Sequence, residues 1–225
     1  MKRLLKVLTV LFLLLAVSIT GVSLWQRENI KSVLLGISED SKEIERQRNE
    51  NQTKLVEEIN EYMDAPVREF TEEEKQMIES GEATVTDVYQ TIFEENSTGT
   101  EINEESAPLS DKDSIVSKYM AELYGLQNTY TAKAETLISQ GASYYESIKT
   151  GPQDPVARAA TISHFTPLVR SLESECDAKV ETILTNLTND LIAIGADTSI
   201  VGTIRTTYAN EKKLKLSYYA NKYLG

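Results

Sequence analysis

Apolar residues recur at three- and four-residue intervals over most of the chain, with polar residues between them. This spacing is typical of amphipathic α-helices, because residues three and four apart share one face of a helix. The pattern is most regular in residues 113–225, where Gly151, Pro152 and Gly195 separate three long stretches. It predicts an all-α protein whose C-terminal part is an elongated antiparallel three-helix bundle.

Helix-capping residues agree with these three stretches. Ser110 or Asp111 is suited to cap the first helix, and Asp154 with Pro155 is suited to open the second. Pro167 predicts either a kink or a new start within the second helix. The third helix is expected to begin after Asp197 or Thr198, once an αL residue at Gly195 has ended the second.

Residues 7–25 are uncharged, mostly apolar and about as long as a helix that crosses a bilayer. Lys2, Arg3 and Lys6 precede this segment, so the positive-inside rule places the N-terminus in the cytoplasm. We expect residues 1–25 to be a cytoplasmic tail and a single-pass anchor in the plasma membrane, with the body outside. The alternative is a cleaved signal peptide, which would make the body a secreted protein.

Residues 26–64 are predicted to form a helical stalk. Their apolar residues follow a coiled-coil spacing, with Ser41, Arg48 and Asn51 at seam positions between them. Polar seam residues fix the register of a coiled coil, which implies a partner helix: a second copy, or the chain's own C-terminal helices. The alternative is a solvated single helix stabilised by Glu and Lys pairs.

Two shorter segments follow the stalk. Pro66 ends it, and residues 65–95 are expected to form a short helical hairpin opened by a capping box of Thr71 and Glu74. Residues 96–112 have almost no apolar periodicity and are acidic, so a linker and domain boundary are expected there.

The net charge of -12 is concentrated in the middle of the chain, where residues 26–112 hold 9 Lys/Arg against 23 Asp/Glu. An acidic segment disfavours nucleic acid and anionic lipid as its partners and favours a basic protein. The third C-terminal helix is basic instead. Its candidate interaction surface consists of Arg205, Lys212, Lys213, Lys215 and Lys222.

This basic surface suits an anionic envelope polymer, membrane headgroups or an acidic protein. The alternative is that it balances the acidic stalk of the same chain.

No residue pattern predicts catalysis, cofactor binding or metal binding. His164 is the only histidine and Cys176 the only cysteine, and neither has a second ligand or a nucleophile motif nearby. The second C-terminal helix has an apolar stripe at three- and four-residue spacing, made of Val169, Leu172, Cys176, Val180, Ile183, Leu187, Leu191 and Ile194. Because Cys176 lies on this stripe between Leu172 and Val180, we expect a buried, inert thiol. The alternatives are a reactive thiol or an intermolecular disulfide.

About the last half of the chain resembles uncharacterised membrane-anchored helical proteins of Gram-positive bacteria. The likeness is carried by LESECDAKVE (172–181), IGADT (194–198) and YANEK (208–212). The resemblance implies a surface location in a bacterium.

Anchor, helices and charge together predict a non-enzymatic, extracytoplasmic helical scaffold or interaction protein of the cell envelope. It is expected to act with a protein partner or a second copy of itself. The alternatives are a ligand-binding or sensory ectodomain that acts through a partner, and an envelope enzyme.

Overall fold

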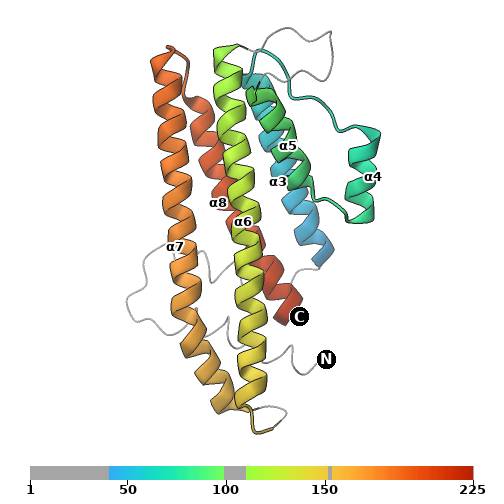
Figure 1. The fold of residues 1–225 in the computed structure, drawn as a ribbon, viewed down its shortest axis with the longest axis vertical. Helices are drawn as coiled ribbons and strands as arrows, with labels where there is room; N and C mark the ends of the chain where they lie inside the picture. Colours follow the sequence, from blue (N-terminus) through green and yellow to red (C-terminus); the bar gives the residue numbers. More distant parts are fainter. Residues whose placement is uncertain (1–40, 99–109, 152–153, 225) are drawn as a thin grey trace. The chain divides into compact units, whose positions relative to one another are not determined.

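The structure, a computed structural model, describes residues 41–98, 110–151 and 154–224; for residues 41, 98 and 219–224 it describes the backbone alone. Within these ranges the chain forms six α-helices and no β-strand (Figure 1), which confirms the all-α fold class there. The helices are α3 (Ser41–Tyr62), α4 (Glu72–Ser80), α5 (Val85–Thr98), α6 (Asp111–Ile148), α7 (Pro155–Ala193) and α8 (Ser199–Leu224).

None of the helices in the described ranges is long and apolar enough to cross a membrane. The predicted span, residues 7–25, lies outside these ranges, as do residues 26–40 of the predicted stalk.

The ends of the shorter helices follow from local sequence. The capping box that opens α4 is present: the amide of Glu74 donates to Thr71 Oγ1 at 3.2 Å, and the amide of Thr71 donates to a Glu74 carboxylate oxygen at 2.8 Å. Gly81 ends α4 in the left-handed region at φ 77°. Helix α5 runs to Thr98, so the first residues of the predicted 96–112 linker are helical instead.

The long helices also begin and end where their caps predict. Ser110 Oγ accepts from the amide of Asp113 at 3.2 Å at the start of α6. Asp154 Oδ1 accepts from the amides of Val156 and Ala157 at the start of α7. Helix α7 continues through Pro167 without a restart and ends before Gly195, which has φ 71°.

The described chain divides into two compact units, each assembled from segments far apart in the sequence. Helices α3, α6, α7 and α8 each give one part to either unit, so the units follow packing and not sequence order. The sequential division into anchor, stalk, hairpin, linker and bundle stays a prediction. In the described ranges, unit 1 comprises residues 41–53, 134–151, 154–172 and 206–224, and unit 2 comprises 54–98, 110–133 and 173–205.

Unit 1 contains two antiparallel helix pairs. The start of α3 lies along the end of α8, where Asn51 Nδ2 donates to the carbonyl of Thr207 at 3.2 Å. The end of α6 lies along the start of α7, where the rings of Tyr144 and His164 stack with centroids 5.0 Å apart.

Unit 2 holds most of the apolar core of the described chain. Of the eleven largest fully buried side chains, nine belong to this unit, among them Ile59, Phe93, Met120 and Leu187. Helix α6 buries two faces here. Tyr119 reaches α7, where its hydroxyl donates to Asp190 Oδ2 at 2.6 Å, while Tyr124 stacks on Phe93 of α5.

The predicted apolar stripe of α7 needs a correction. Val180, Leu187 and Leu191 are buried as expected, but Leu184 replaces Ile183 as a fully buried residue. Ile194 is exposed, because it lies beyond the last residue of the helix. Cys176 was predicted to be buried and is only partly buried.

Candidate interaction surfaces

The polar seam of α3 faces α8 in unit 1. Arg48 donates from Nε to Glu211 Oε1 at 2.9 Å, and its Nη2 lies 2.8 Å from the same oxygen. The guanidinium also lies 5.8 Å from the Tyr218 ring centroid. Asn51, the next seam residue, bonds the α8 backbone one turn away. For the described part of the predicted stalk, the partner helix is therefore the chain's own C-terminal helix. The sequence suggested that basic residues of the C-terminal helix balance acidic residues of the stalk. In this ion pair the charges are reversed, because the stalk supplies the arginine and α8 supplies the glutamate.

In unit 2 a buried carboxylate on α6 accepts hydrogen bonds from the backbone just after the end of α3. The Asp113 side chain is fully buried and accepts from the amides of Asp64 and Ala65, each at 2.9 Å. These amides follow the last turn of α3 and would otherwise need water. Tyr62, the last residue of α3, donates to the carbonyl of Asp197 before α8. Sequence reasoning missed the role of Asp113, because nothing local links it to a turn almost fifty residues earlier.

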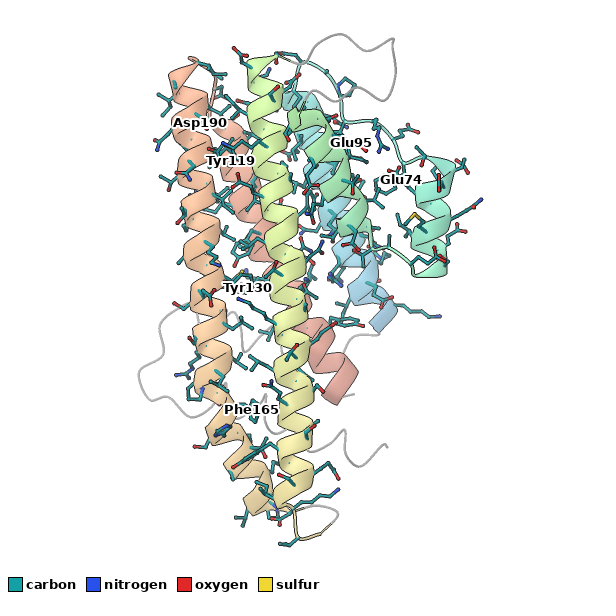
Figure 2. All side chains as sticks on the ribbon, in the orientation of Figure 1. Glu74, Glu95, Tyr119, Tyr130, Phe165 and Asp190 are labelled. Carbon is teal, nitrogen blue, oxygen red and sulfur yellow. The ribbon has the colours of Figure 1, made fainter. Side chains whose placement is uncertain are left out.

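A second set of charges in unit 2 holds the α4 segment against α5. Arg68 donates from both terminal nitrogens to Glu74, at 2.9 and 2.8 Å, and from Nη2 to Glu95 at 3.1 Å. Figure 2 shows Glu74 and Glu95 on the two neighbouring helices. The hydrogen bond from Arg68 lowers the pKa of Glu74 to about 2. The predicted hairpin of residues 65–95 is thus joined by charge as well as by apolar contact.

Two tyrosines of α6 occupy the contact with α7 in unit 2 (Figure 2). Burial, together with the hydrogen bond to Asp190, raises the pKa of Tyr119. The Tyr130 ring is buried beneath Lys133 and Lys179, whose Nζ atoms lie 4.6 and 5.6 Å from its centroid. Both lysines also pair with Glu175, so these contacts stabilise helix packing by cation–π and ionic attraction.

The five residues of the predicted basic surface belong to two units. Arg205 belongs to unit 2, where it donates to both carboxylate oxygens of Glu181 on α7, at 2.9 and 3.1 Å. The four lysines belong to unit 1. There Lys212, Lys213 and Lys215 are partly buried, while the side chain of Lys222 is outside the described set. Arg205 therefore forms an intramolecular ion pair, and Lys212 Nζ lies 5.9 Å from the ring centroid of Tyr208 on its own helix.

Charge is divided unequally between the units. The described residues of unit 1 include 10 Lys/Arg and 7 Asp/Glu, a net charge of +3. Those of unit 2 include 8 Lys/Arg and 22 Asp/Glu, a net charge of -14. Unit 2 thus presents an acidic surface suited to a basic partner, whereas unit 1 is weakly basic.

Five large apolar side chains of the described chain are exposed: Met77 of α4, Val156, Leu168 and Ile192 of α7, and Ile194 just after α7. Val156, in the first turn of α7 in unit 1, is 75% exposed. Ile192 and Ile194 are exposed at the other end of the helix, in unit 2. Single exposed apolar residues are ordinary on a protein surface, so the exposure of Val156 does not by itself indicate a binding site.

The two residues considered for chemistry belong to different units. His164 is exposed in unit 1 and stacks on Tyr144, whereas Cys176 lies in unit 2. In the described part of the chain, no three His, Cys, Asp or Glu side chains are grouped so as to hold a metal ion.

No protein-family model, curated protein or solved structure matches this chain.

Proposed function

We propose that this chain is a non-enzymatic, single-pass membrane protein whose helical body lies outside the cytoplasm and acts as a scaffold or interaction protein of the cell envelope. Residues 7–25 are the proposed anchor, and the N-terminus is cytoplasmic. The observation that carries the proposal is the attachment of α3, which follows the anchor in sequence, to the rest of the body. Arg48 and Asn51 join α3 to α8, and Asp113 joins its end to α6.

A segment held in this way is suited to a mechanical role. A flexible linker would let the body change its orientation freely. Helix α3 is instead packed against α8 and α6. Its apolar face is buried, with Ile44 and Ile59 fully shielded from solvent. Because α3 is packed into the body, the described chain offers a fixed surface from its first helix onward, and a fixed surface is what a scaffold requires.

The acidic surface of unit 2 supports a basic protein partner. Unlike charges on two surfaces speed their encounter and favour their correct orientation. A second copy of the chain would bring two surfaces of net charge -14 together. Like charges repel, so a homo-oligomer would have to form through another surface.

Topology mapping tests the proposal. Mass spectrometry of the mature chain should show Met1 or Lys2 as the first residue. A membrane-impermeant protease added to intact cells should digest residues of both units and leave the N-terminal residues protected. A mature chain that begins between residues 18 and 25, or a body protected from the protease, would contradict the proposal.

A further inference from the structure

Helix α4 of unit 2 adds no side chain to the buried core. None of its nine residues is buried: Glu74 and Ile78 are partly buried, and the other seven are exposed. In Figure 1, α4 lies at the edge of unit 2, beyond α5. A helix this short is unstable alone in water, and most helices in proteins are stabilised by the burial of one face. Other interactions must therefore hold α4.

Caps at both ends keep α4 helical. The capping box of Thr71 and Glu74 satisfies amides at its start. At its end Gly81 is in the left-handed region, and the amides of residues 81 and 82 donate to carbonyls of the last turn at 3.2 and 2.9 Å.

Two side-chain contacts place α4 beside α5. Arg68 joins Glu74 of α4 to Glu95 of α5. The ring of Phe70, just before α4, has its centroid 4.8 Å from that of Tyr89 on α5. The chain thus holds in place a helix that its own core does not use, so the outward face of α4 is available for contact with another molecule.

The exposed side of α4 and its flanks is acidic. Residues 69–82 contain six glutamates and one lysine, a net charge of -5. Arg68 and Lys75 each pair with one of these glutamates. Three exposed glutamates take part in no ion pair of the described chain: Glu73, Glu79 and Glu82. Basic groups of a partner can pair with these carboxylates.

An apolar side chain lies among these carboxylates. Met77 is 37% exposed and lies one turn after Glu73 on the same face of α4. A methionine side chain is flexible and polarisable, so it adapts to apolar partners of different shape. The surface is therefore complementary to a segment that presents basic and apolar residues side by side.

We propose that α4 docks a basic amphipathic helix of a partner protein, whose lysines and arginines pair with Glu73, Glu79 and Glu82 and whose apolar residues cover Met77. The inference rests on the proposed function, since it names the part of unit 2 that the basic partner contacts. Helix α4 is ~14 Å long at 1.5 Å per residue, so two to three turns of the partner lie along it.

The combination of charge and apolar contact distinguishes this partner from others. A polyamine or a metal ion would use carboxylates alone, and in the described part of the chain no three acidic side chains are grouped so as to hold a metal ion. Anionic lipid would be repelled by the same carboxylates. In a second copy of the chain, only the weakly basic unit 1 has a net charge opposite to that of α4.

The test uses the full chain in dodecyl maltoside, with the detergent alone as the blank. The probe is a fluorescein-labelled helical peptide of Lys, Leu and Ala whose leucines share one face. Fluorescence anisotropy should show binding to the wild-type chain that weakens as the salt concentration rises. A peptide of the same composition in scrambled order has no apolar face and should bind roughly fivefold more weakly.

Charge variants separate α4 from the general charge of unit 2. The first variant should weaken binding roughly tenfold, because it removes three ion pairs with the peptide; it combines Glu73→Gln, Glu79→Gln and Glu82→Gln. The matched control should weaken binding less than about twofold. It makes the same change at exposed glutamates on α3 and α6 of unit 2: Glu57, Glu61 and Glu122.

Two further variants test the apolar contact and the helix. Met77→Ser should weaken binding roughly fivefold, whereas Ile192→Ser removes a more exposed apolar side chain of unit 2 and should have no effect. Gln76→Pro breaks α4 but keeps every charge and Met77, and it should weaken binding roughly tenfold. The other helices should still unfold cooperatively, because α4 buries no residue.

Several results would overturn the inference. Equal losses from the two sets of glutamate substitutions would show that the peptide responds to the net charge of unit 2 and not to α4. Wild-type affinity in Met77→Ser or Gln76→Pro would exclude an apolar contact or an ordered helix as the recognised feature. Self-association of the full chain that the first glutamate variant weakens, measured by sedimentation, would assign the surface to a second copy.

Failure of this inference can be told apart from failure of the proposed function. If the wild-type chain does not bind the peptide while topology mapping places the body outside the cell, the α4 surface alone is excluded. If the body lies inside the cell, the proposed function is wrong, although binding that depends on Met77 and on the helix would still support α4 as the surface for a basic partner.

Discussion

Arg48 and Glu211, which are 163 residues apart, form an ion pair that joins α3 to α8 in unit 1. Glu211 is only 8% exposed, and Nε and Nη2 of Arg48 both lie within 3 Å of the same oxygen, Oε1. The second oxygen, Oε2, is buried and has no hydrogen-bond partner in the described part of the chain. Glu211 therefore depends on Arg48 to offset the cost of burying its charge.

Removing one partner of this pair should be costly. Arg48→Leu leaves the Glu211 carboxylate buried without its cation, and we expect the free energy of unfolding to fall by about 2–4 kcal/mol. The double variant Arg48→Leu with Glu211→Leu should recover most of the loss, because an apolar pair needs no desolvation of charge. Urea denaturation of the three proteins gives the double-mutant cycle.

Arg46→Leu is the matched control for Arg48→Leu. Arg46 lies on the same helix, is 56% exposed and, among the described residues, pairs with Glu43 and Glu50 of α3. Pairs of this kind contribute about 0.5 kcal/mol or less. Equal losses from both arginine substitutions would show that the pair with Glu211 has no special weight.

Asp113 should be essential for the turn that leaves α3. Asp113→Ala removes both acceptors of the Asp64 and Ala65 amides, and we expect a loss of about 2–4 kcal/mol from two unsatisfied donors. Asp111→Ala, an exposed change in the same first turn of α6, should cost less than about 1 kcal/mol. Hydrogen exchange should also quicken at Asp64 and Ala65 in the first variant alone; unchanged exchange there would contradict the assignment.

Stability should depend on the ionisation of Glu74. Its hydrogen bond from Arg68 lowers the pKa to about 2, from an ordinary value of 4.5. A lowered pKa in the folded state means that the contribution is complete above pH 4.5 and is lost as the pH falls toward 2. After allowance for solvent screening, about 1 kcal/mol should disappear in this window.

Glu74→Gln isolates this contribution. The difference in unfolding free energy between the wild type and this variant should shrink between pH 5 and pH 2, as followed by denaturant titration. Glu73→Gln changes an exposed carboxylate of the same turn and should show no comparable narrowing. If the difference in unfolding free energy between the wild type and Glu74→Gln stays constant from pH 5 to pH 2, the ion pair with Arg68 is not the source of that difference.

Two glycines should respond to alanine with opposite signs. Gly195 has φ 71°, where a Cβ is strained, so Gly195→Ala should destabilise the chain by about 1 kcal/mol. Gly202 lies inside α8 with open space around the position of a Cβ, so Gly202→Ala should stabilise it by about 0.5–1 kcal/mol. Thermal unfolding followed by circular dichroism measures both changes in stability. A more stable Gly195→Ala variant would contradict the role of Gly195 as a helix cap.

Cys176 should behave as a partly shielded thiol. A thiol reagent should label the native chain measurably, but more slowly than the unfolded chain. Cys176→Ala should cost less than about 1 kcal/mol, whereas Val180→Ala, one turn along and buried, should cost about 1–3 kcal/mol. If the reagent labels Cys176 only after unfolding, the thiol is buried in the native chain, as the apolar stripe predicts.

Helices and their ends are determined by the sequence alone. The capping box of Thr71 and Glu74 and the left-handed Gly195 depend on residues at most five positions apart, so their physics is local. The same holds for the polar seam of α3, because periodicity shows that Arg48 and Asn51 share a face. What the sequence does not show is which surface that face meets.

The tertiary structure decided the pairing of helices and the distribution of charge. Which helix meets Arg48, which amides meet Asp113 and how many faces of α6 are buried depend on packing summed over the whole described chain. A stripe counted along one helix assumes one buried face, and it fails for α6, which packs α7 through Tyr119 and α5 through Tyr124. The charge follows the same logic: segments distant in sequence fold into a basic unit and an acidic one, because long-range packing, unlike a cap or a turn, is not encoded within a few residues.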